Sequence, residues 1–480
     1  MSAEADLERL RGLVGGALAS LETSRGRIDD LNVYPVPDGD TGTNLTLTVR
    51  AVAEAVAAAE EADRPALARA VARAALMGAR GNSGVILSQI VRGVADVLAE
   101  ATNGDDPQLT ARALRGASDA AYRAVRRPVE GTMLTVIREL AEEAERRAGD
   151  PEPLGDLLVE LVRHGEGAVA RTPAQLDILR EAGVVDAGGA GLVELLRGVA
   201  AAVTGLGDKT AIKVHVHTDD PGAALSLGTA AGTVEGVEIA NMHEQQEQRE
   251  RRLSVVPSPL AACGVLAVVA GDGNRLLFET LAEPVGTIRV VTGGQTANPS
   301  TAELVAALEE LRADAAIVLP NNADVRLAAE HAAEQAGRPA EIVPTESIPA
   351  GLAALVTYDG TRTAAENAAA MAAAAAAVVT GEITRAPRDV SLNGFAIRRG
   401  EWLGLADGEP VAGGDDFAAV ASSVVARLLA EPRLILTLLT GDEPPPLDGL
   451  LERLASAHPE LEIEVHEGSQ PHYPLLLGAE

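Results

Sequence analysis

The feature that most constrains the fold of this chain is its shortage of aromatic side chains. Among 480 residues there are one Trp, four Tyr and three Phe, although hydrophobic residues make up 47% of the chain. The core must therefore be built from Ala, Leu and Val, and small side chains of this kind favour closely packed helices. A chain of this length has room for about two to four domains, each with its own core.

The N-terminal part of the chain carries hydrophobic residues at helical spacing. The first stripe consists of Leu7, Leu10, Val14, Leu18 and Leu21. The same pattern recurs over 44–59, 65–77, 84–99, 110–126, 131–147, 154–170 and 189–203. Gly, Pro, Asp and Asn are concentrated between these stretches, where helices end and begin. The sequence therefore predicts a nearly all-helical domain over residues 1–205.

After about residue 210 the pattern changes to short strands separated by helical stretches. Predicted strands lie at 212–218, 263–270, 287–292, 315–320, 341–345, 433–439 and 461–466. This alternation indicates an α/β domain, which we place at 256–480. Between the two domains, residues 206–255 are expected to form a short middle segment and linker, because the stretch HEQQEQRERRL at 243–253 is strongly polar.

The charge and the cysteine content exclude several classes of protein. The chain has 40 basic and 70 acidic side chains, a formal net charge of −30, which argues against nucleic-acid binding because phosphate backbones require clustered Lys and Arg. Cys263 is the single cysteine, so no internal disulfide can form. The N-terminus does not have the pattern of a signal peptide, and no stretch has that of an integral membrane segment, so we expect a cytoplasmic protein.

Lysine is almost absent, and this limits the chemistry of the helical domain. Lys209 and Lys213 are the only two lysines. Any nucleotide chemistry in the first 200 residues must therefore work without a P-loop lysine or the strand lysine of protein kinases. Metal ions, backbone N–H groups, hydroxyls and arginine remain available.

The most informative motif is NVYPVPDGDTGTN at residues 32–44. Its prolines forbid a helix and its glycines permit a tight turn, which would present Asp38 and Asp40 together. Carboxylates two positions apart can bind one hard cation or bridge two, as Mg²⁺ is held beside phosphates. Thr43 or Asn44 can cap the helix that follows, whose free N–H groups would face a phosphate. The alternative is an ordinary Asp-Gly turn in front of a helix.

Three further motifs place glycine, hydroxyl or acidic residues at a helix start. They are GARGNSG at 78–84, PVEGTMLTVIREL at 128–140 and GVVDAGGAGL at 183–192. Four such helix starts in one lysine-poor domain would converge naturally on a metal–nucleotide complex. The alternative is that they are four unrelated helix caps.

In this order, the four motifs resemble the ATP-binding domain of the dihydroxyacetone kinase L-subunit type. The whole chain resembles the fatty acid kinase ATP-binding subunit family, with further matches at KVHVHTDDPG (213–222), VEIANMHEQ (237–245), GGQTANPST (293–301), LPNN (319–322), VPTESIPAGLAAL (343–355) and EGSQPHYPLLLGAE (467–480). The resemblance implies an eight-helix barrel that holds Mg-ATP at one end. It also implies that a separate DegV-type protein presents a fatty acid, which is converted to an acyl phosphate.

The resemblance also implies roles for individual residues. Asp38 and Asp40 match the metal-binding and catalytic aspartates, and Asn32 lies one position from a third metal-binding site. Expected nucleotide contacts are Thr41, Gly42, Thr43, Asn44, Asn82, Ser83, Gly131, Thr132, Asp186, Ala187 and Gly188.

The middle segment departs from the family pattern, because it is short and lacks a cysteine-containing strand. His215 and His217 lie on one face of a predicted strand and could bind zinc. A closed zinc site normally needs four ligands. We therefore expect these histidines to be structural and the segment to carry no tightly bound zinc.

Two alternative functions remain open at this point. One is a dihydroxyacetone- or glycerone-like kinase for a small substrate, and the other is a non-catalytic nucleotide-binding scaffold. The oligomeric state also remains open, with a homodimer among the options. For the main hypothesis, we expect the region from about residue 255 to dock the partner protein and to be dispensable for binding ATP.

Overall fold

The computed structural model describes residues 3–32, 39–59, 63–101, 107–149, 152–205, 221–231, 261–281, 287–295, 297–386, 388–392 and 395–480. Asp38, His215, His217 and the predicted strand at 212–218 lie outside the described residues. The chain divides into two compact units, one made of residues 1–206 and 261–480 and the other of residues 207–260. In the second unit the structure describes helix α10 (Pro221–Ala231).

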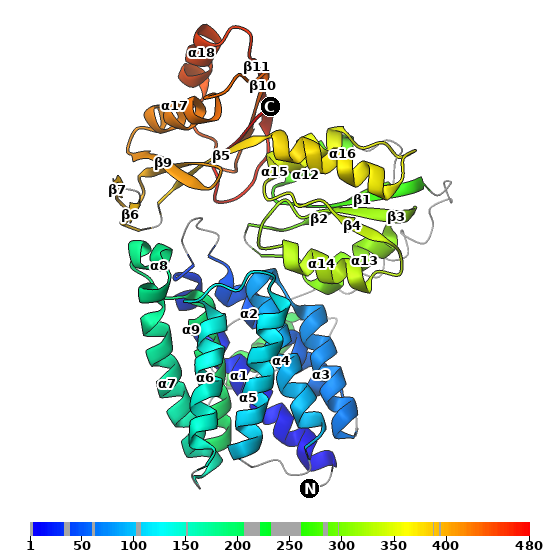
Figure 1. Cartoon of the computed structure of the whole chain (residues 1–480), viewed down its shortest axis with the longest axis vertical. Coiled ribbons are helices and arrows are strands. Elements are labelled where there is room, and N and C mark those ends of the chain that lie inside the picture. Colours follow the sequence, from blue (N-terminus) through cyan, green and yellow to red (C-terminus); the bar gives the residue numbers. More distant parts are fainter. Residues whose placement is uncertain are drawn as a thin grey trace. The chain divides into compact units, whose positions relative to one another are not determined.

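The N-terminal part of the first unit is a ring of long helices (Figure 1). These are α1 (Ala3–Asp29), α2 (Thr41–Ala58), α3 (Arg64–Gly78), α4 (Gly81–Ala99), α5 (Pro107–Ala124), α6 (Met133–Arg147), α7 (Leu154–Gln175) and α9 (Ala187–Thr204), with the short α8 (Asp177–Ala182) after α7. Each long helix packs against the next, and α9 closes the ring by contacting both α7 and α1. The predicted eight-helix barrel is confirmed.

The inside of the ring is filled by aliphatic side chains, as the shortage of aromatic residues predicted. Fully buried members include Leu21, Ile28, Leu45, Leu87, Ile137, Leu140, Leu157 and Leu161. Helix α9 is the one helix in the described ranges that is long and apolar enough to cross a membrane. Because 56% of this helix is buried inside the unit, its apolar side chains serve the core of the ring.

A four-stranded parallel sheet opens the C-terminal region, with the strand order β2-β1-β3-β4. Its strands are β1 (Ala261–Val269), β2 (Ile288–Thr292), β3 (Ala313–Leu319) and β4 (Ala340–Ile342). Helices α13 (Thr301–Glu310) and α14 (Arg326–Gln335) cover one face, and α12 (Asp272–Thr280), α15 (Ile348–Val356) and α16 (Ala364–Ala377) cover the other. The first pair of helices also contacts the ring, α13 against α3 and α14 against α4.

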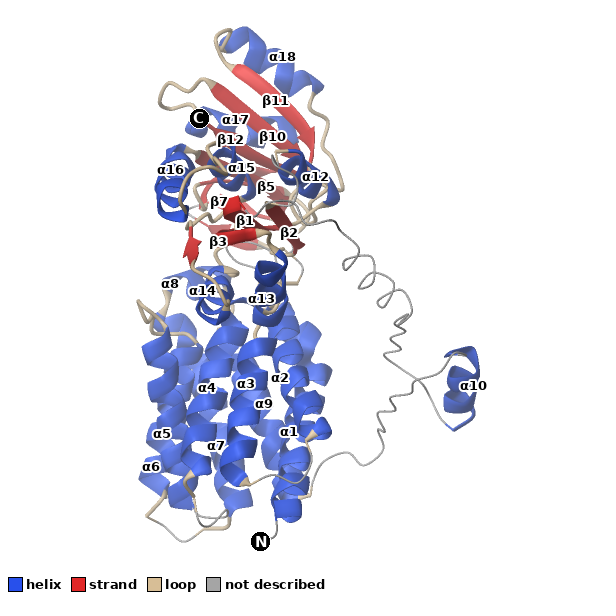
Figure 2. Ribbon diagram, turned by 90° about the vertical axis from the view of Figure 1, so that its right-hand side faces the viewer, coloured by secondary structure: helices blue, strands red, loops and turns tan. Residues whose placement is uncertain are grey.

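A six-stranded mixed sheet completes the C-terminal region, with the order β11-β10-β12-β5-β8-β9 (Figure 2). It contains β5 (Val379–Arg385), β8 (Trp402–Ala406), β9 (Glu409–Gly414), β10 (Ile435–Thr440), β11 (Glu462–Glu467) and β12 (Leu475–Ala479). Helices α17 (Phe417–Leu428) and α18 (Asp448–Ala457) pack on it, and β6 (Val390–Leu392) pairs with β7 (Phe395–Ile397). The predicted α/β class is confirmed, while β5, β6, β7, β8, β9 and β12 had not been predicted.

Candidate functional site

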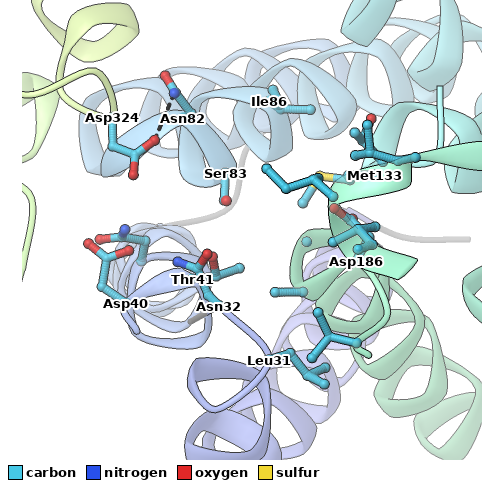
Figure 3. Close-up of a pocket in the computed structure, with 18 residues that line it drawn as sticks. Leu31, Asn32, Asp40, Thr41, Asn82, Ser83, Ile86, Met133, Asp186 and Asp324 are labelled. Atoms are coloured by element: carbon cyan, nitrogen blue, oxygen red, sulfur yellow. Dashed lines mark hydrogen bonds between the residues drawn. The ribbon is translucent and has the colours of Figure 1, made fainter. Parts of the chain in front are cut away.

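A cavity of about 250 Å³ lies where several helices of the ring begin (Figure 3). It is lined by Leu31, Asn32, Asp40, Thr41, Asn44, Asn82, Ser83, Ile86, Thr132, Met133, Leu176, Ile178, Leu179, Val184, Asp186, Ala187, Gly188 and Asp324. The starts of α2, α4, α6 and α9 all contribute to this wall. The structure therefore brings together the four sequence motifs, which lie far apart in the chain.

Asp40 stands at the N-cap position of α2, but its side chain does not cap the helix. Only 2% of the residue is exposed, and its Oδ2 accepts a hydrogen bond from Nδ2 of Asn298 at 2.6 Å. Burial and the nearby carboxylate of Asp324 raise the pKa of Asp40 above its ordinary value, although a hydrogen bond from Asn44 opposes this. An acid held in this way favours any cation that can neutralise it.

The capping of α2 falls instead to Asp29, the last residue of α1. Its carboxylate accepts hydrogen bonds from the backbone N–H and the hydroxyl of Thr43, both at 2.9 Å. Gly42 packs against the same helix end, where an added Cβ would lie 2.4 Å from the carbonyl oxygen of Arg25. Thr43 and Gly42, expected to contact a nucleotide, therefore face α1 and do not line the cavity. Sequence reasoning missed Asp29, whose capping role depends on α1 and α2 meeting.

The start of α4 places two amide- and hydroxyl-bearing side chains on the cavity wall. Asn82 and Ser83 both line it, and Nδ2 of Asn82 donates to Oδ1 of Asp324 at 2.9 Å. Gly81 has a φ of +58°, a conformation that glycine adopts at little cost. An added Cβ there would also lie 2.7 Å from Nδ2 of Asn44 and 2.9 Å from Nδ2 of Asn298.

The starts of α6 and α9 form the other wall. Thr132 caps α6, and Asp186 caps α9 by accepting the N–H of Gly189 at 2.6 Å. Burial raises the pKa of Asp186 to about 6 against the hydrogen bonds from Gly189 and Met133. Gly131 is not among the residues that line the cavity, and its N–H donates to the Thr135 hydroxyl at 2.8 Å.

The two ends of the cavity differ in chemistry (Figure 3). One end carries Asp40, Asn82 and Asp324, and toward the other end lie Leu31, Met133 and Asp186. The lining also includes the apolar side chains of Ile86, Leu176, Ile178, Leu179 and Val184. The lining contains no Lys, Arg or His among the described residues. An anion in the polar end would therefore depend on cations and on backbone N–H groups.

The donor atoms at the polar end suit a hard cation. Oδ1 of Asn44 and Oδ1 of Asn82 are buried and accept no hydrogen bond from any described residue. Amide and carboxylate oxygens are the ligands that Mg²⁺ prefers. The described residues contain no group of three or more His, Cys, Asp or Glu side chains placed to hold a metal, and Asp38, the expected partner of Asp40, lies outside them.

Two residues of the site come from the C-terminal region and were not predicted as such. Asn298 follows β2 and Asp324 follows β3, so both leave the sheet at its carboxyl edge. In sequence the surrounding motifs, GGQTANPST and LPNN, match the family, and we expected the region from about residue 255 to dock a partner protein. The carboxyl edge of a parallel sheet, where such folds usually bind ligands, is the signal that could have pointed to these two residues.

Three family models match the chain along its length. A DAK2 domain matches residues 35–201, the middle domain of the FakA-like fatty acid kinase family matches residues 189–249, and the C-terminal domain of the same family matches residues 264–480. Together they cover the ring, the middle segment and the α/β region in the expected order.

Relatives of full length are found in staphylococci. An uncharacterized protein of Staphylococcus haemolyticus is 31% identical over 538 residues, covering 96% of this chain and 97% of the relative. One from Staphylococcus aureus (strain USA300) is 30% identical over 534 residues, covering 96% of each. Because these alignments are longer than 480 residues, the relatives contain segments that this chain lacks.

Solved structures overlap parts of the chain. The dihydroxyacetone kinase from C. freundii in complex with AMP-PNP and Mg²⁺ covers 40% of this chain and 33% of its own, at 16% identity and a TM-score of 0.32. The DegV family protein Cg2579 from Corynebacterium glutamicum covers 46% of this chain and 96% of its own, at 14% identity and a TM-score of 0.35.

Proposed function

The chain belongs to the FakA-like fatty acid kinase family, and from this premise we propose that it is the ATP-binding subunit of a two-protein kinase. It would transfer the γ-phosphate of ATP to the carboxylate of a fatty acid held by a separate DegV-type binding protein. The product would be an acyl phosphate. The observation that carries this proposal is the cavity onto which four helix starts converge, with acidic and amide groups at one end and the apolar side chains of Leu31 and Met133 toward the other.

The two ends of the cavity suit the two ends of ATP. The end with Leu31 and Met133 would suit a flat base, and Asp186 at the start of α9 lies beside it. The polar end receives the starts of α2 and α4, whose free N–H groups favour phosphate. The γ-phosphate would then lie near Asp40 and Asp324, next to the α/β region.

Since no basic side chain of the described residues lines the cavity, binding a triphosphate would require Mg²⁺. We expect Asp40 to hold it, together with Asp38 and Asn32. When bound, the metal would neutralise phosphate charge that the chain's own side chains leave uncompensated. The orphaned amide oxygen of Asn44 agrees with this assignment.

A carboxylate acceptor would need no strong general base at the site. A fatty acid with a pKa near that of Glu, about 4.3, is already ionised at pH 7, so its attack needs positioning more than proton removal. The main energetic barrier is the repulsion between the fatty acid carboxylate and the γ-phosphate, which metal ions and aligned N–H groups reduce. A hydroxyl acceptor would instead need help in losing its proton.

Two alternatives stay open as outcomes of the test. The DAK2 match also suits a dihydroxyacetone- or glycerone-like kinase acting on a small substrate. A non-catalytic nucleotide-binding scaffold would keep the cavity but transfer nothing.

The deciding experiment incubates the full chain with Mg-ATP and a DegV-type partner, with and without bound fatty acid, and measures acyl phosphate as hydroxamate. We expect product only when partner, fatty acid and ATP are all present, and none with Asp40→Asn. Phosphorylation of free dihydroxyacetone or glycerol would favour the small-substrate kinase. Nucleotide binding without any transfer to either acceptor would favour the scaffold.

A further inference from the structure

The α/β region reaches the cavity through the carboxyl edge of its parallel sheet. In the strand order β2-β1-β3-β4, the connections change direction between β1 and β3. Ligands of such sheets usually bind at this switch point, outside the carboxyl ends of the strands. The loop that leaves β3 there carries Asp324, which lines the cavity from the side opposite α2 (Figure 3).

Asp324 is held in place from both sides. Its backbone N–H donates to Oδ1 of Asn322 at 2.7 Å, which closes a tight turn. The Asn322 amide in turn donates to the carbonyl oxygen of Gly294 after β2. From the ring, Asn82 donates to the Asp324 carboxylate at 2.9 Å. The carboxylate is therefore aimed into the cavity by contacts with both regions.

Asn298 makes a second contact at the same end. It is 1% exposed, and it donates to Asp40 at 2.6 Å. Its Oδ1 is buried and accepts no hydrogen bond from the residues that the structure describes. This single amide thus fixes the carboxylate that the family resemblance assigns to metal binding.

The contact between the two regions has a packed interface around it. Ala79 and Val85 of the ring are fully buried in one hydrophobic cluster with residues of β1, β3, α13 and α14. The N–H of Thr301 donates to the carbonyl oxygen of Ala79 at 3.1 Å, and Arg80 forms an ion pair with Glu303 at 2.9 Å. Such packing can hold Asn298 and Asp324 to the precision that a ligand site requires.

We propose that the nucleotide site is a composite of both regions, in which Asp324 is an additional carboxylate facing the bound cation and Asn298 positions Asp40. The inference rests on the proposed Mg-nucleotide function. Two carboxylates, Asp40 and Asp324, lie at one end of the cavity with Asn44, whose buried Oδ1 accepts no hydrogen bond from the described residues, and carboxylate and amide oxygens are the ligands that a hard cation prefers. A divalent cation compensates this arrangement, whereas an unpaired anion there would meet repulsion.

One consequence contradicts the expectation drawn from sequence. If the α/β region supplies part of the cation site, it is required for full affinity toward Mg-nucleotide and is not dispensable for binding ATP. Docking of the α/β region and nucleotide binding would then be coupled, and each would stabilise the other.

The test uses the full chain and measures binding of Mn²⁺-ADP by calorimetry and of Mn²⁺ by electron paramagnetic resonance. Asp324→Asn keeps the hydrogen-bonding shape and removes the charge. We expect a loss of about tenfold or more in Mn²⁺-dependent affinity, in the range seen when groups around a metal are removed, with metal-free ADP binding unchanged. The matched control is Asp314→Asn, an exposed aspartate of the same β3 strand, which should bind as the wild type does.

Asn298→Ala provides a second test of Mn²⁺ binding, because this variant keeps the carboxylates of both Asp40 and Asp324. It should weaken Mn²⁺ binding less than Asp324→Asn and should broaden the Mn²⁺ spectrum as Asp40 loses its fixed position. Unchanged or tighter Mn²⁺-ADP binding by Asp324→Asn would overturn the inference. Tighter binding would mean that the Asp324 carboxylate opposes binding of the nucleotide. If the wild type itself binds no metal–nucleotide, the proposed function fails before this inference is reached.

Discussion

The helical ring and the α/β region build one cavity by different means. The ring packs backbone against backbone: an added Cβ at Gly16 of α1 would lie 2.5 Å from the carbonyl oxygen of Gly198 on α9, and Gly93 and Gly116 meet in the same way between α4 and α5. Its cavity residues stand at helix starts within compact motifs. The α/β region is a layered sheet structure that contributes single loop residues. The comparison teaches that the ring sets the shape of the site, whereas the α/β region adjusts its chemistry.

The largest effect should come from breaking the ring at a glycine contact. Gly16→Leu must push α1 away from α9, because the nearest atom to an added Cβ, at 2.5 Å, is the backbone carbonyl oxygen of Gly198, which cannot move aside. We expect a loss of about 5 kcal/mol of unfolding free energy, or failure to fold, measured by urea denaturation. The control is Gly12→Leu, one helical turn earlier on α1, where nothing lies within 4 Å of an added Cβ. Equal stability of the two variants would show that the ring tolerates wider helix spacing.

The next effect should be chemical and should leave the ring intact. Asp40→Asn removes a buried charge from the polar end while keeping the side-chain shape, so we expect at least a thousandfold loss of phosphotransfer, about 4 kcal/mol, with no loss in melting temperature. Asp38→Asn should behave similarly. Asp177→Asn, an exposed aspartate of α8, serves as the control. Near wild-type turnover of either variant at saturating Mg²⁺ would refute its assignment as a metal ligand.

The polar cavity residues of the ring could be predicted because they lie in short motifs, whereas the apolar lining residues Leu31, Ile86, Leu176, Ile178 and Leu179 lie outside those motifs. Asp40, Asn82 and Asp186 stand at helix starts that local spacing and turn residues reveal. Asp29 could not be predicted, because its role as a cap exists only once α1 and α2 meet. Asn298 and Asp324 belong to a different region of the chain from Asp40, and no local pattern joins them to it.

The strands missed by sequence have a similar explanation. β5 and β8 contain Gly381 and Gly404, which weaken the strand signal. These glycines sit where α17 presses on the sheet, and added Cβ atoms would lie 2.8 and 2.5 Å from Val424. Close packing of α17 on the sheet therefore requires glycine at these two positions, although glycine has a low propensity for β-strands. For this reason the sequence pattern did not reveal β5 and β8. The predicted α/β class is correct because β1 and residues 315–319 of β3 are continuous hydrophobic runs, which the sequence reveals.

A smaller effect should make the stability of the α/β region depend on pH through one buried carboxyl group. Glu382 of β5 has a buried Oε2 that accepts no hydrogen bond from any described residue, and burial raises its pKa to about 7. The folded state therefore holds a proton that the unfolded state has released, so stability falls as the pH rises from about 4.5 to 7. Glu382→Gln stays neutral, and at pH 8 it should be about 2–3 kcal/mol more stable than the wild type. The change should appear in the unfolding of the α/β region.

The exposed Glu409 of β9, in the same sheet, provides the matched control, since Glu409→Gln alters a carboxylate that faces solvent. Its stability should follow the wild type at every pH. If Glu382→Gln shows the same pH dependence as the wild type, the carboxyl is ionised in the folded protein and another group within the sheet compensates it.

The smallest effect concerns the ion pair that joins the two regions. Arg80 of the ring contacts Glu303 of α13 at 2.9 Å, with side chains 21% and 51% exposed. Arg80 also donates to the carbonyl oxygen of Asn298 at 2.9 Å, so a single substitution would mix two contacts, and a double-mutant cycle is needed. Glu303→Gln removes the charge but can still complete the capping box of α13 with Ser300, and Arg80→Met removes the partner. Because water screens this pair, we expect a coupling of only about 0.5–1 kcal/mol in unfolding free energy, reduced in about 1 M salt.

A coupling above about 2 kcal/mol would exceed what a screened pair supplies. It would mean that the two regions depend on this ion pair more than on the buried cluster around Val85. A coupling of zero would leave that hydrophobic contact as the main link between them.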